Sequence, residues 1–255
     1  QVAGPTASGK SGAGLELAAR LGGTHLNRDS VQVYRELRLL TARPSNADEA
    51  RVPHRLYGTV PAAQAYSVGR WLVDAGSAIA EAHGEGRLPI LVGGTGLYFK
   101  ALTEGLAPVR DIPAESRSYW RGRSEQLGRD ALHAELAARD LAMAARLGPA
   151  DPQRIVRALE VIDATAVSLA EWQGGNATPL LAPGDSLRLV IAPEREPLYA
   201  AIDARFDRMI EDGALDEVAA LTALGLDPSL PAMRAIGVPE LVGVLRKKLS
   251  APEAV

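Results

Sequence analysis

The sequence predicts an α/β fold, in which a parallel sheet with a phosphate-binding loop carries helices on both faces and is interrupted by a helical insertion. A complete phosphate-loop pattern occupies residues 4–11 and leads directly into a helical pattern. Segments typical of strands then alternate with segments typical of helices, which is how parallel sheets are connected. Residues 111–175 differ, because they contain helical patterns and no convincing strand.

The phosphate loop reads GPTASGKS and fits the G-x-x-x-x-G-K-[ST] spacing at every position. Its glycines let backbone N–H groups curl around an anion, Lys10 adds a positive charge, and Ser11 offers a hydroxyl group to Mg²⁺. The helix that follows turns its positive end towards the same anion. Phosphate or nucleotide binding is therefore expected at Gly4, Pro5, Thr6, Ala7, Ser8, Gly9, Lys10 and Ser11. The pattern does not identify the phosphate.

The other elements of the sheet follow in chain order. Short apolar runs predict strands, at residues 24–27, 88–92 and 187–192. Runs with helical spacing predict helices at residues 11–21, 67–83 and 96–102, with Ser67 as the N-cap of the second. A further long helix is predicted to follow the strand at 187–192 and to end at residue 212. The α/β core is thus predicted to comprise residues 1–110 and 176–255, with residues 111–175 as a helical insertion domain.

Composition narrows the class of protein. A chain of 255 residues with 47% hydrophobic content can bury a substantial core. The net charge of −3 argues against a wholly basic surface, so any polyanion must meet a local patch. The absence of cysteine excludes disulfides and thiolate zinc sites. No run of about 18 apolar residues occurs, which predicts that no segment spans a membrane and fits a cytoplasmic protein.

Polar residues follow two of the predicted strands. Asn27-Arg28-Asp29-Ser30 follows one, and Gly93-Gly94-Thr95 follows another. Ligands of open parallel sheets bind outside the carboxyl ends of the strands, so Asp29 and Thr95 would converge on whatever the loop holds. Two simpler interpretations stay open, in which Asp29 caps a helix starting at residues 30–32 and Thr95 caps the helix after the turn. Asp29 could also act as a general base or support a metal ion.

The strand at 88–92 lacks the acidic end with which many phosphate-loop hydrolases hold Mg²⁺, which weakens that interpretation. Arg205 is informative because it falls at the edge of an apolar helical arc formed by Leu198, Ile202, Phe206, Met209 and Ile210. An arginine facing a core needs an anion, which is either a buried carboxylate or a phosphate.

A second helix start lies inside the insertion. Asp151 is its predicted N-cap and Pro152 occupies its first turn. Apolar residues share one face, at Ile155, Leu159 and Ile162, and polar residues share the other, at Gln153, Arg154 and Arg157. The polar face is either simply solvated or a clamp for a phosphate backbone or a base.

Several of these segments belong together in a known family. They include GPTASGKS at 4–11, DSVQVYR at 29–35, TARPS at 41–45, LVGGTGLYFKAL at 91–102, DPQRIVRALEV at 151–161, ARFDRMIEDG at 204–213 and MRAIGVPEL at 233–241. In this combination and order, the whole chain resembles the bacterial tRNA dimethylallyltransferases, also called tRNA isopentenyltransferases, of the IPP transferase family. Arg28 departs from the pattern, because many members have alanine before the Asp-Ser pair.

The resemblance implies a specific activity. The family transfers a dimethylallyl group from dimethylallyl diphosphate to the exocyclic amine of the adenosine on the 3′ side of the tRNA anticodon. It implies Mg²⁺ as cofactor, with Ser11 as ligand, a monomer, and the anticodon stem-loop as partner. By resemblance, Asp29 is the general base, Thr95 lines the reaction channel and Arg205 contacts diphosphate. The positions that match tRNA contacts are Asp29, Ser30, Val31, Gln32, Thr95, Arg117, Gln153, Arg154, Ile155, Val156 and Arg157.

Three alternatives remain at this point. An adenylate isopentenyltransferase would modify free nucleotides, but it needs no long helical insertion. A small-molecule kinase would share the phosphate loop, but no acidic strand end and no arginine-rich lid are visible. A non-enzymatic RNA-binding protein would have no use for an intact Lys10, Ser11 and Asp29.

Overall fold

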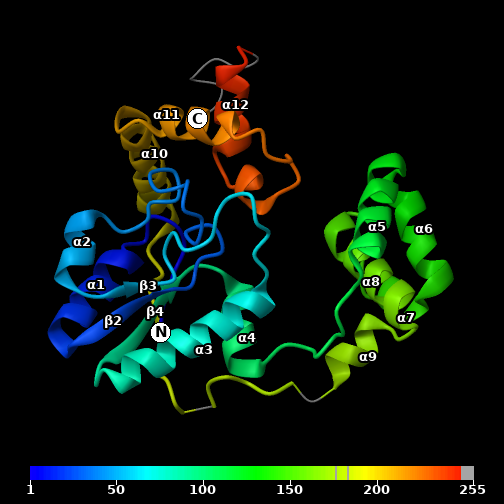
Figure 1. The fold of residues 1–255 in the computed structure, drawn as a ribbon, viewed down its shortest axis with the longest axis horizontal. Coiled ribbons are helices and arrows are strands. Elements are labelled where there is room, and N and C mark those ends of the chain that lie inside the picture. The colour runs from blue at the N-terminus through cyan, green and yellow to red at the C-terminus, as the bar shows by residue number, and fades with distance from the viewer. Residues whose placement is uncertain (176, 183, 248–255) are drawn as a thin grey trace. The chain divides into compact units, whose positions relative to one another are not determined.

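The computed structural model describes residues 1–175, 177–182 and 184–247. The chain forms two compact units, of which the first combines residues 1–103 with 180–255 and the second comprises residues 104–179 (Figure 1). The predicted insertion of residues 111–175 falls inside the second unit. Residue 176, at its predicted boundary, lies outside the described residues, as do residues 183 and 248–255 of the predicted core.

The first unit is built on a five-stranded parallel sheet with the strand order β3-β2-β4-β1-β5. The strands are β1 (Val2–Ala3), β2 (Gly23–Asn27), β3 (His54–Arg55), β4 (Leu88–Gly93) and β5 (Leu189–Val190). Val92 of β4 pairs with Asn27 of β2 and with Val2 of β1, so the carboxyl ends of these three strands lie side by side. The predicted α/β fold is confirmed, although β5 is shorter than the predicted strand at 187–192.

Helices of the first unit cover both faces of this sheet. They are α1 (Lys10–Leu21), α2 (Asn46–Arg51), α3 (Val68–Gly84), α4 (Gly96–Glu104), α10 (Arg195–Glu211), α11 (Ala214–Ala223) and α12 (Val238–Leu245), with a 3₁₀ turn at Pro231–Arg234. Side chains alternate between the faces of a strand. Ile90 and Val92 accordingly pack with Leu15 of α1, whereas Leu91 packs in the cluster that contains Trp71 of α3.

Helix α3 begins where the sequence predicts, because the Ser67 hydroxyl accepts the Arg70 N–H at 3.2 Å. Its fully buried Trp71 stacks on Tyr98 of α4 with ring centroids 4.2 Å apart. The Trp71 indole N–H also donates to the carbonyl oxygen of Asn27 at 3.1 Å. One buried side chain therefore anchors two helices beneath the end of β2.

The segment after β2 corrects one expectation. No helix starts at residues 30–32, so the proposal that Asp29 caps a helix there is wrong. Asp29 Oδ1 instead accepts the N–H of Val31 at 3.0 Å within a turn. An aspartate that bonds the backbone two residues ahead favours a turn as readily as a helix start, which explains the error.

Hydrogen bonds also join the loop after this turn to helix α11. The Glu217 carboxylate of α11 accepts the consecutive backbone N–H groups of Arg38, Leu39 and Leu40, at 2.7, 2.8 and 3.0 Å. Charge-assisted bonds of this kind are about twice as strong as neutral ones. Gly237, with φ of 91°, lies against the Leu40 side chain, where a Cβ atom would be crowded. Leu40 is thereby fixed in place.

The second unit is helical among its described residues, as predicted. Its helices are α5 (Ala114–Gln126), α6 (Arg129–Arg139), α7 (Leu141–Ala144), α8 (Pro152–Thr165) and α9 (Leu169–Gly174). Asp151 caps α8, since its Oδ1 accepts the Arg154 N–H at 3.3 Å. The core of this unit gathers Trp120, Leu132, Leu136, Ile155 and Leu159. In neither unit do the described residues include a helix that is long and apolar enough to cross a membrane.

A buried histidine makes the stability of the first unit depend on pH. His25 of β2 is 1% exposed, and its Nδ1 lies 2.9 Å from the Tyr57 hydroxyl. Burial, with a smaller effect of His54, lowers the pKa of His25 from 6.5 to about 3. An unfolded histidine binds a proton near pH 6.5, so the stability contributed by neutral His25 is fully present above that pH and is lost as pH falls.

We predict that about 2 kcal/mol of the free energy of unfolding attributable to His25 is lost between about pH 6.5 and 5. Urea unfolding at a series of pH values measures the slope, which His25→Gln should flatten. His83→Gln, on the exposed surface of α3, is the matched control and should keep the wild-type slope. Equal slopes for His25→Gln and wild type would contradict the assignment.

Candidate active site

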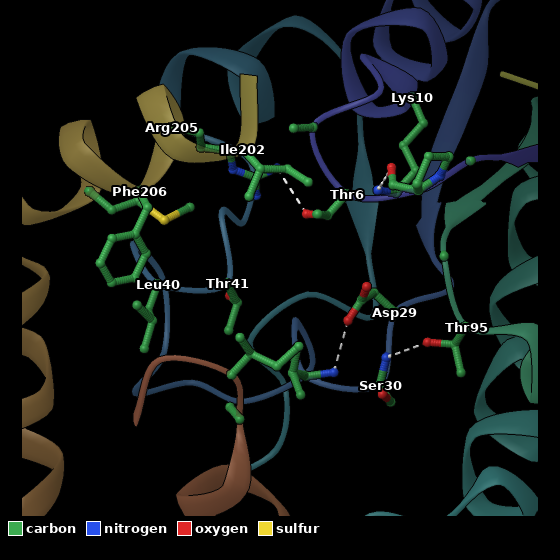
Figure 2. A pocket seen from close by; sticks show the side chains of 18 of the residues that line it. Thr6, Lys10, Asp29, Ser30, Leu40, Thr41, Thr95, Ile202, Arg205 and Phe206 are labelled. Atoms are coloured by element: carbon green, nitrogen blue, oxygen red, sulfur yellow. Dashed lines mark hydrogen bonds between the residues drawn. The ribbon is translucent and has the colours of Figure 1, made fainter. Parts of the chain in front are cut away.

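The first unit contains a pocket of about 460 Å³ at the carboxyl edge of the sheet (Figure 2). Such a volume lies within the usual range of small-molecule sites. The loop after β1, the turn after β2, Gly94 and Thr95 after β4, and one face of α10 all contribute to its walls. This is the edge at which open parallel sheets bind their ligands.

The phosphate loop forms one wall of the pocket. Ala7 and Gly9 have φ angles of 56° and 83°, in the left-handed region. Alternation of this kind turns successive backbone N–H groups towards one point and makes an anion-binding concavity. The Lys10 ammonium donates to the carbonyl oxygen of Pro5 at 3.0 Å and lines the pocket. These backbone angles are those that an anion-binding loop requires, and the binding of a phosphate by this loop stays a prediction.

Asp29 and Thr95 reach the same pocket from neighbouring strand ends, as Figure 2 shows. The backbone N–H of Ser30 donates to the Thr95 hydroxyl oxygen at 3.2 Å, and the N–H of Arg28 donates to the carbonyl oxygen of Val92 at 2.8 Å. These bonds join the turn after β2 to the end of β4. The expected convergence of Asp29 and Thr95 on the loop is thus present in the structure.

Arg205 of α10 supplies a second cation. Its Nη1 donates to the Thr6 hydroxyl at 3.5 Å, and its guanidinium lines the pocket beside the loop (Figure 2). Burial lowers the pKa of Lys10, opposed by Asp29, and the charges of Arg205 and Arg28 lower it further. Burial likewise lowers the pKa of Arg205. Arg234 also lines the pocket, so three cations face the single Asp29 carboxylate, and this excess of positive charge favours an anionic ligand.

The opposite wall of the pocket is mainly apolar, with Leu40 and Phe206 placed on it in Figure 2. Among the pocket residues that the sequence did not assign to the site are the apolar Leu40, Ile202, Phe206, Met209, Ala235 and Ile236 and the polar Thr41 and Arg234. The apolar arc of α10 was a signal for three of them, but periodicity alone suggested a core face. Ile236 at 93% exposed is a large apolar side chain on the rim.

The predicted site residues separate into three groups. Those that line the pocket are Gly4, Pro5, Thr6, Ala7, Lys10, Asp29, Ser30, Val31, Thr95 and Arg205. Those of the first unit outside the pocket lining are Ser8, Gly9, Ser11 and Gln32. The Gln32 amide donates to the carbonyl oxygens of Thr41 and Ala42, at 2.8 and 3.0 Å. Those of the second unit are Arg117, Gln153, Arg154, Ile155, Val156 and Arg157.

The five consecutive residues of α8 do not share one environment. Ile155 and Val156 are buried in the helical core, so their side chains cannot reach a ligand in this structure. Gln153 and Arg154 are exposed, and Arg154 pairs with Asp151 at 3.2 Å. Arg157 pairs at 3.3 Å with Glu160, whose side chain is 7% exposed. Arg157 therefore has a structural role as the partner of a buried carboxylate.

Comparison with known proteins adds the family. The sequence profile described as IPP transferase matches residues 32–255. The chain belongs to the IPP transferase family. It is 59% identical over 253 residues to a protein from a Bradyrhizobium strain named tRNA dimethylallyltransferase, covering 99% of this chain and 83% of that protein. A protein of the same name from Methylocella silvestris is 52% identical, covering 100% of this chain and 84% of its own length.

Solved structures of the family agree with this fold. The tRNA isopentenylpyrophosphate transferase of Bacillus halodurans matches with a TM-score of 0.66 and 33% identity, over 99% of this chain and 78% of that one. A eukaryotic dimethylallyltransferase whose structure is described as acting on tRNA matches with a TM-score of 0.77 and 27% identity, over 97% of this chain and 63% of that one. The predicted family is confirmed.

A substitution at Gly93 tests whether the close approach of the ends of β2 and β4 requires a glycine at this position. A Cβ atom there would overlap the carbonyl oxygen of Arg28, whereas nothing lies within 4 Å of a Cβ atom at Gly96. We predict that Gly93→Ala lowers the free energy of unfolding by about 1–3 kcal/mol through overpacking. Gly96→Ala is the control and should leave it unchanged or slightly raised. Chemical denaturation measures both, and a wild-type midpoint for Gly93→Ala would contradict the packing argument.

Proposed function

We propose that this protein transfers a dimethylallyl group from dimethylallyl diphosphate to the exocyclic amine of the adenosine on the 3′ side of the anticodon in tRNA. The observation that carries the proposal is one pocket with a cationic phosphate loop on one wall, an apolar wall opposite, and the Asp29 carboxylate beside both. Membership of the family and the names of its relatives support it.

The donor suits the two walls of the pocket. Backbone N–H groups of the loop, with Lys10 and Arg205, would hold the diphosphate as a leaving group that gains negative charge. Ile202, Phe206 and Met209 would surround the five-carbon chain and keep water from the allylic carbon as positive charge develops on it. A kinase would have no use for an apolar wall in that position, which favours a prenyl donor over the kinase alternative.

A magnesium ion at the loop would need phosphate oxygens of the substrate as ligands besides Ser11. Ser11 is exposed in the first turn of α1, where its hydroxyl can serve as one ligand. Within the described residues no group of three histidine, cysteine or acidic side chains could hold a metal ion without further ligands. Mg²⁺ commonly takes one or two protein oxygens together with phosphate oxygens and water. When bound, it would neutralise charge on the departing diphosphate.

Asp29 supplies the base that the reaction needs. An adenine amine is a weak nucleophile because its lone pair is delocalised into the ring. As its nitrogen bonds to the allylic carbon, the bond from that carbon to the diphosphate oxygen breaks, and the Asp29 carboxylate accepts the amine proton. The hydrogen bond from Val31 to Asp29 Oδ1 leaves Oδ2 for that proton. The adenine of the tRNA must leave its stacked position to enter the pocket, at a cost of a few kcal/mol.

Labelled dimethylallyl diphosphate, offered with tRNA or with AMP, tests the activity and the free-nucleotide alternative together. We expect label in tRNA only. Asp29→Asn should reduce turnover about 10²-fold or more while calorimetry still detects donor binding, because only proton transfer is lost. Labelled AMP would favour the adenylate enzyme, and wild-type turnover of Asp29→Asn at saturating substrate would remove Asp29 from the role of base.

The polar surface of the second unit is proposed to bind the RNA backbone. Arg117 and Arg154 are exposed there, and the ion pair of Arg154 with Asp151 is a surface pair of small energy. Arg157 is unsuitable for a simple test, because its removal would leave the buried Glu160 without its ion-pair partner. Arg154 is therefore the residue to change.

We predict that Arg154→Ala weakens tRNA binding and lowers the log–log salt slope by roughly 0.7–0.9, the value of one phosphate contact. Donor affinity should not change. The measurement is tRNA binding over a range of salt concentrations. Arg146→Ala removes an exposed arginine of the same unit that matches no tRNA contact, and it serves as the control. Identical slopes for Arg154→Ala and wild type would return this helix face to a merely solvated role.

A further inference from the structure

Asn27 is the last residue of β2, and its side chain is fully buried two residues before Asp29. Its amide makes three hydrogen bonds. Oδ1 accepts the backbone N–H of Asp29 at 2.7 Å, and Nδ2 donates to the carbonyl oxygens of Asp29 and Leu56, both at 3.0 Å. One side chain thus binds both polar groups of the Asp29 backbone.

The Asn27 amide fits this position in one orientation only. An amide has an acceptor oxygen and a nitrogen with two donors, which is what one N–H group and two carbonyl oxygens require. An aspartate would turn a second oxygen towards both carbonyls, and a serine could replace only part of the set. The third bond also holds Leu56, whose φ of 68° is unusual for a residue with a side chain.

These bonds leave the Asp29 carboxylate little freedom. Its backbone is held at N and O by Asn27, its Oδ1 is held by the N–H of Val31, and the next residue is bonded to Thr95. A general base must lie within hydrogen-bond reach of the proton that it removes. Displacement of a reacting group by about 1 Å can reduce a rate by roughly 10²-fold.

We propose that Asn27 is a positioning residue for Asp29, which orients the carboxylate towards the acceptor amine without touching either substrate. This inference rests on the proposed role of Asp29 as base. It differs from a purely structural role, in which Asn27 would only join the ends of β2 and β3, because it requires that the effect of Asn27 on rate pass through the Asp29 carboxylate.

The experiment is a double-mutant cycle with Asn27→Ser and Asp29→Asn. Single-turnover rates are measured at saturating donor and tRNA, and donor titration normalises them to folded protein. We expect Asn27→Ser to lower the rate about 10–100-fold with donor affinity within about twofold of wild type. Added to Asp29→Asn, it should slow the reaction by less than about threefold, since contacting residues are not additive. Multiplicative effects, or a wild-type rate for Asn27→Ser, would overturn the proposal.

Two further arms keep the result interpretable. Thr24→Val removes a buried bond from the same strand, because the Thr24 hydroxyl accepts Nε–H of Arg87 at 3.2 Å. It should lower stability and leave the rate unchanged, and an equal rate loss would also overturn the proposal. Asn27→Asp should react more slowly than Asn27→Ser, because its second oxygen would face the two carbonyl oxygens. If Asn27→Asp folds only partly, the rate of Asn27→Ser decides the test. A wild-type rate for Asp29→Asn alone would instead refute the proposed function.

Discussion

The close approach of the carboxyl ends of β2 and β4 is the constraint on which the rest of the site depends. It requires a glycine at 93, where a Cβ atom would overlap the Arg28 carbonyl oxygen, and it is held by hydrogen bonds from Arg28 to Val92 and from Ser30 to Thr95. Because the strands are parallel, the residues that follow them emerge at one edge, beside the loop that follows β1. Asp29, Thr95 and Lys10 share a pocket for this reason, although 66 positions separate Asp29 from Thr95 in sequence.

The charge of the pocket follows from that geometry. Lys10 and Arg205 lose solvation there, and burial lowers the pKa of both, while the Asp29 carboxylate acts in the opposite direction. Lys10, Arg205 and Arg234 line the pocket against the single Asp29 carboxylate, and they leave a positive excess that a diphosphate could neutralise. The apolar wall strengthens this attraction, since charges interact more strongly where water is excluded. In the proposed reaction the same wall would shield the allylic carbon of the donor, so one arrangement would serve both the binding of the anion and the chemistry at the neighbouring carbon.

Local patterns in the sequence predicted the start of α3 at Ser67, the cap of α8 at Asp151 and the strand ends that carry Asp29 and Thr95. Each depends on residues a few positions apart. The turn at Asp29 was not predicted, because an aspartate before a turn and one before a helix offer the same hydrogen bond to the backbone. The role of Glu217 was also beyond reach, because its partners at 38–40 lie far away in sequence and are backbone groups with no pattern of their own. The helical periodicity of α10 identified a shared face but not the pocket that this face lines.

Arg28, directly after β2, has a buried charged side chain, which is normally unfavourable for folding. Its side chain is 1% exposed, and Nη2 donates a hydrogen bond to the Gly93 carbonyl oxygen at 2.7 Å. The other two guanidinium nitrogens, Nε and Nη1, have no hydrogen-bond partner among the described residues. Burial lowers the pKa of Arg28 to about 10, and stacking over Phe99 offsets part of that penalty. An apolar residue of similar volume would be expected to satisfy the fold at least as well. The charge of Arg28 also lowers the pKa of Lys10, so it adds to the positive potential at the phosphate loop. A stability penalty at the end of β2 and a stronger attraction for an anion in the pocket therefore have the same physical cause.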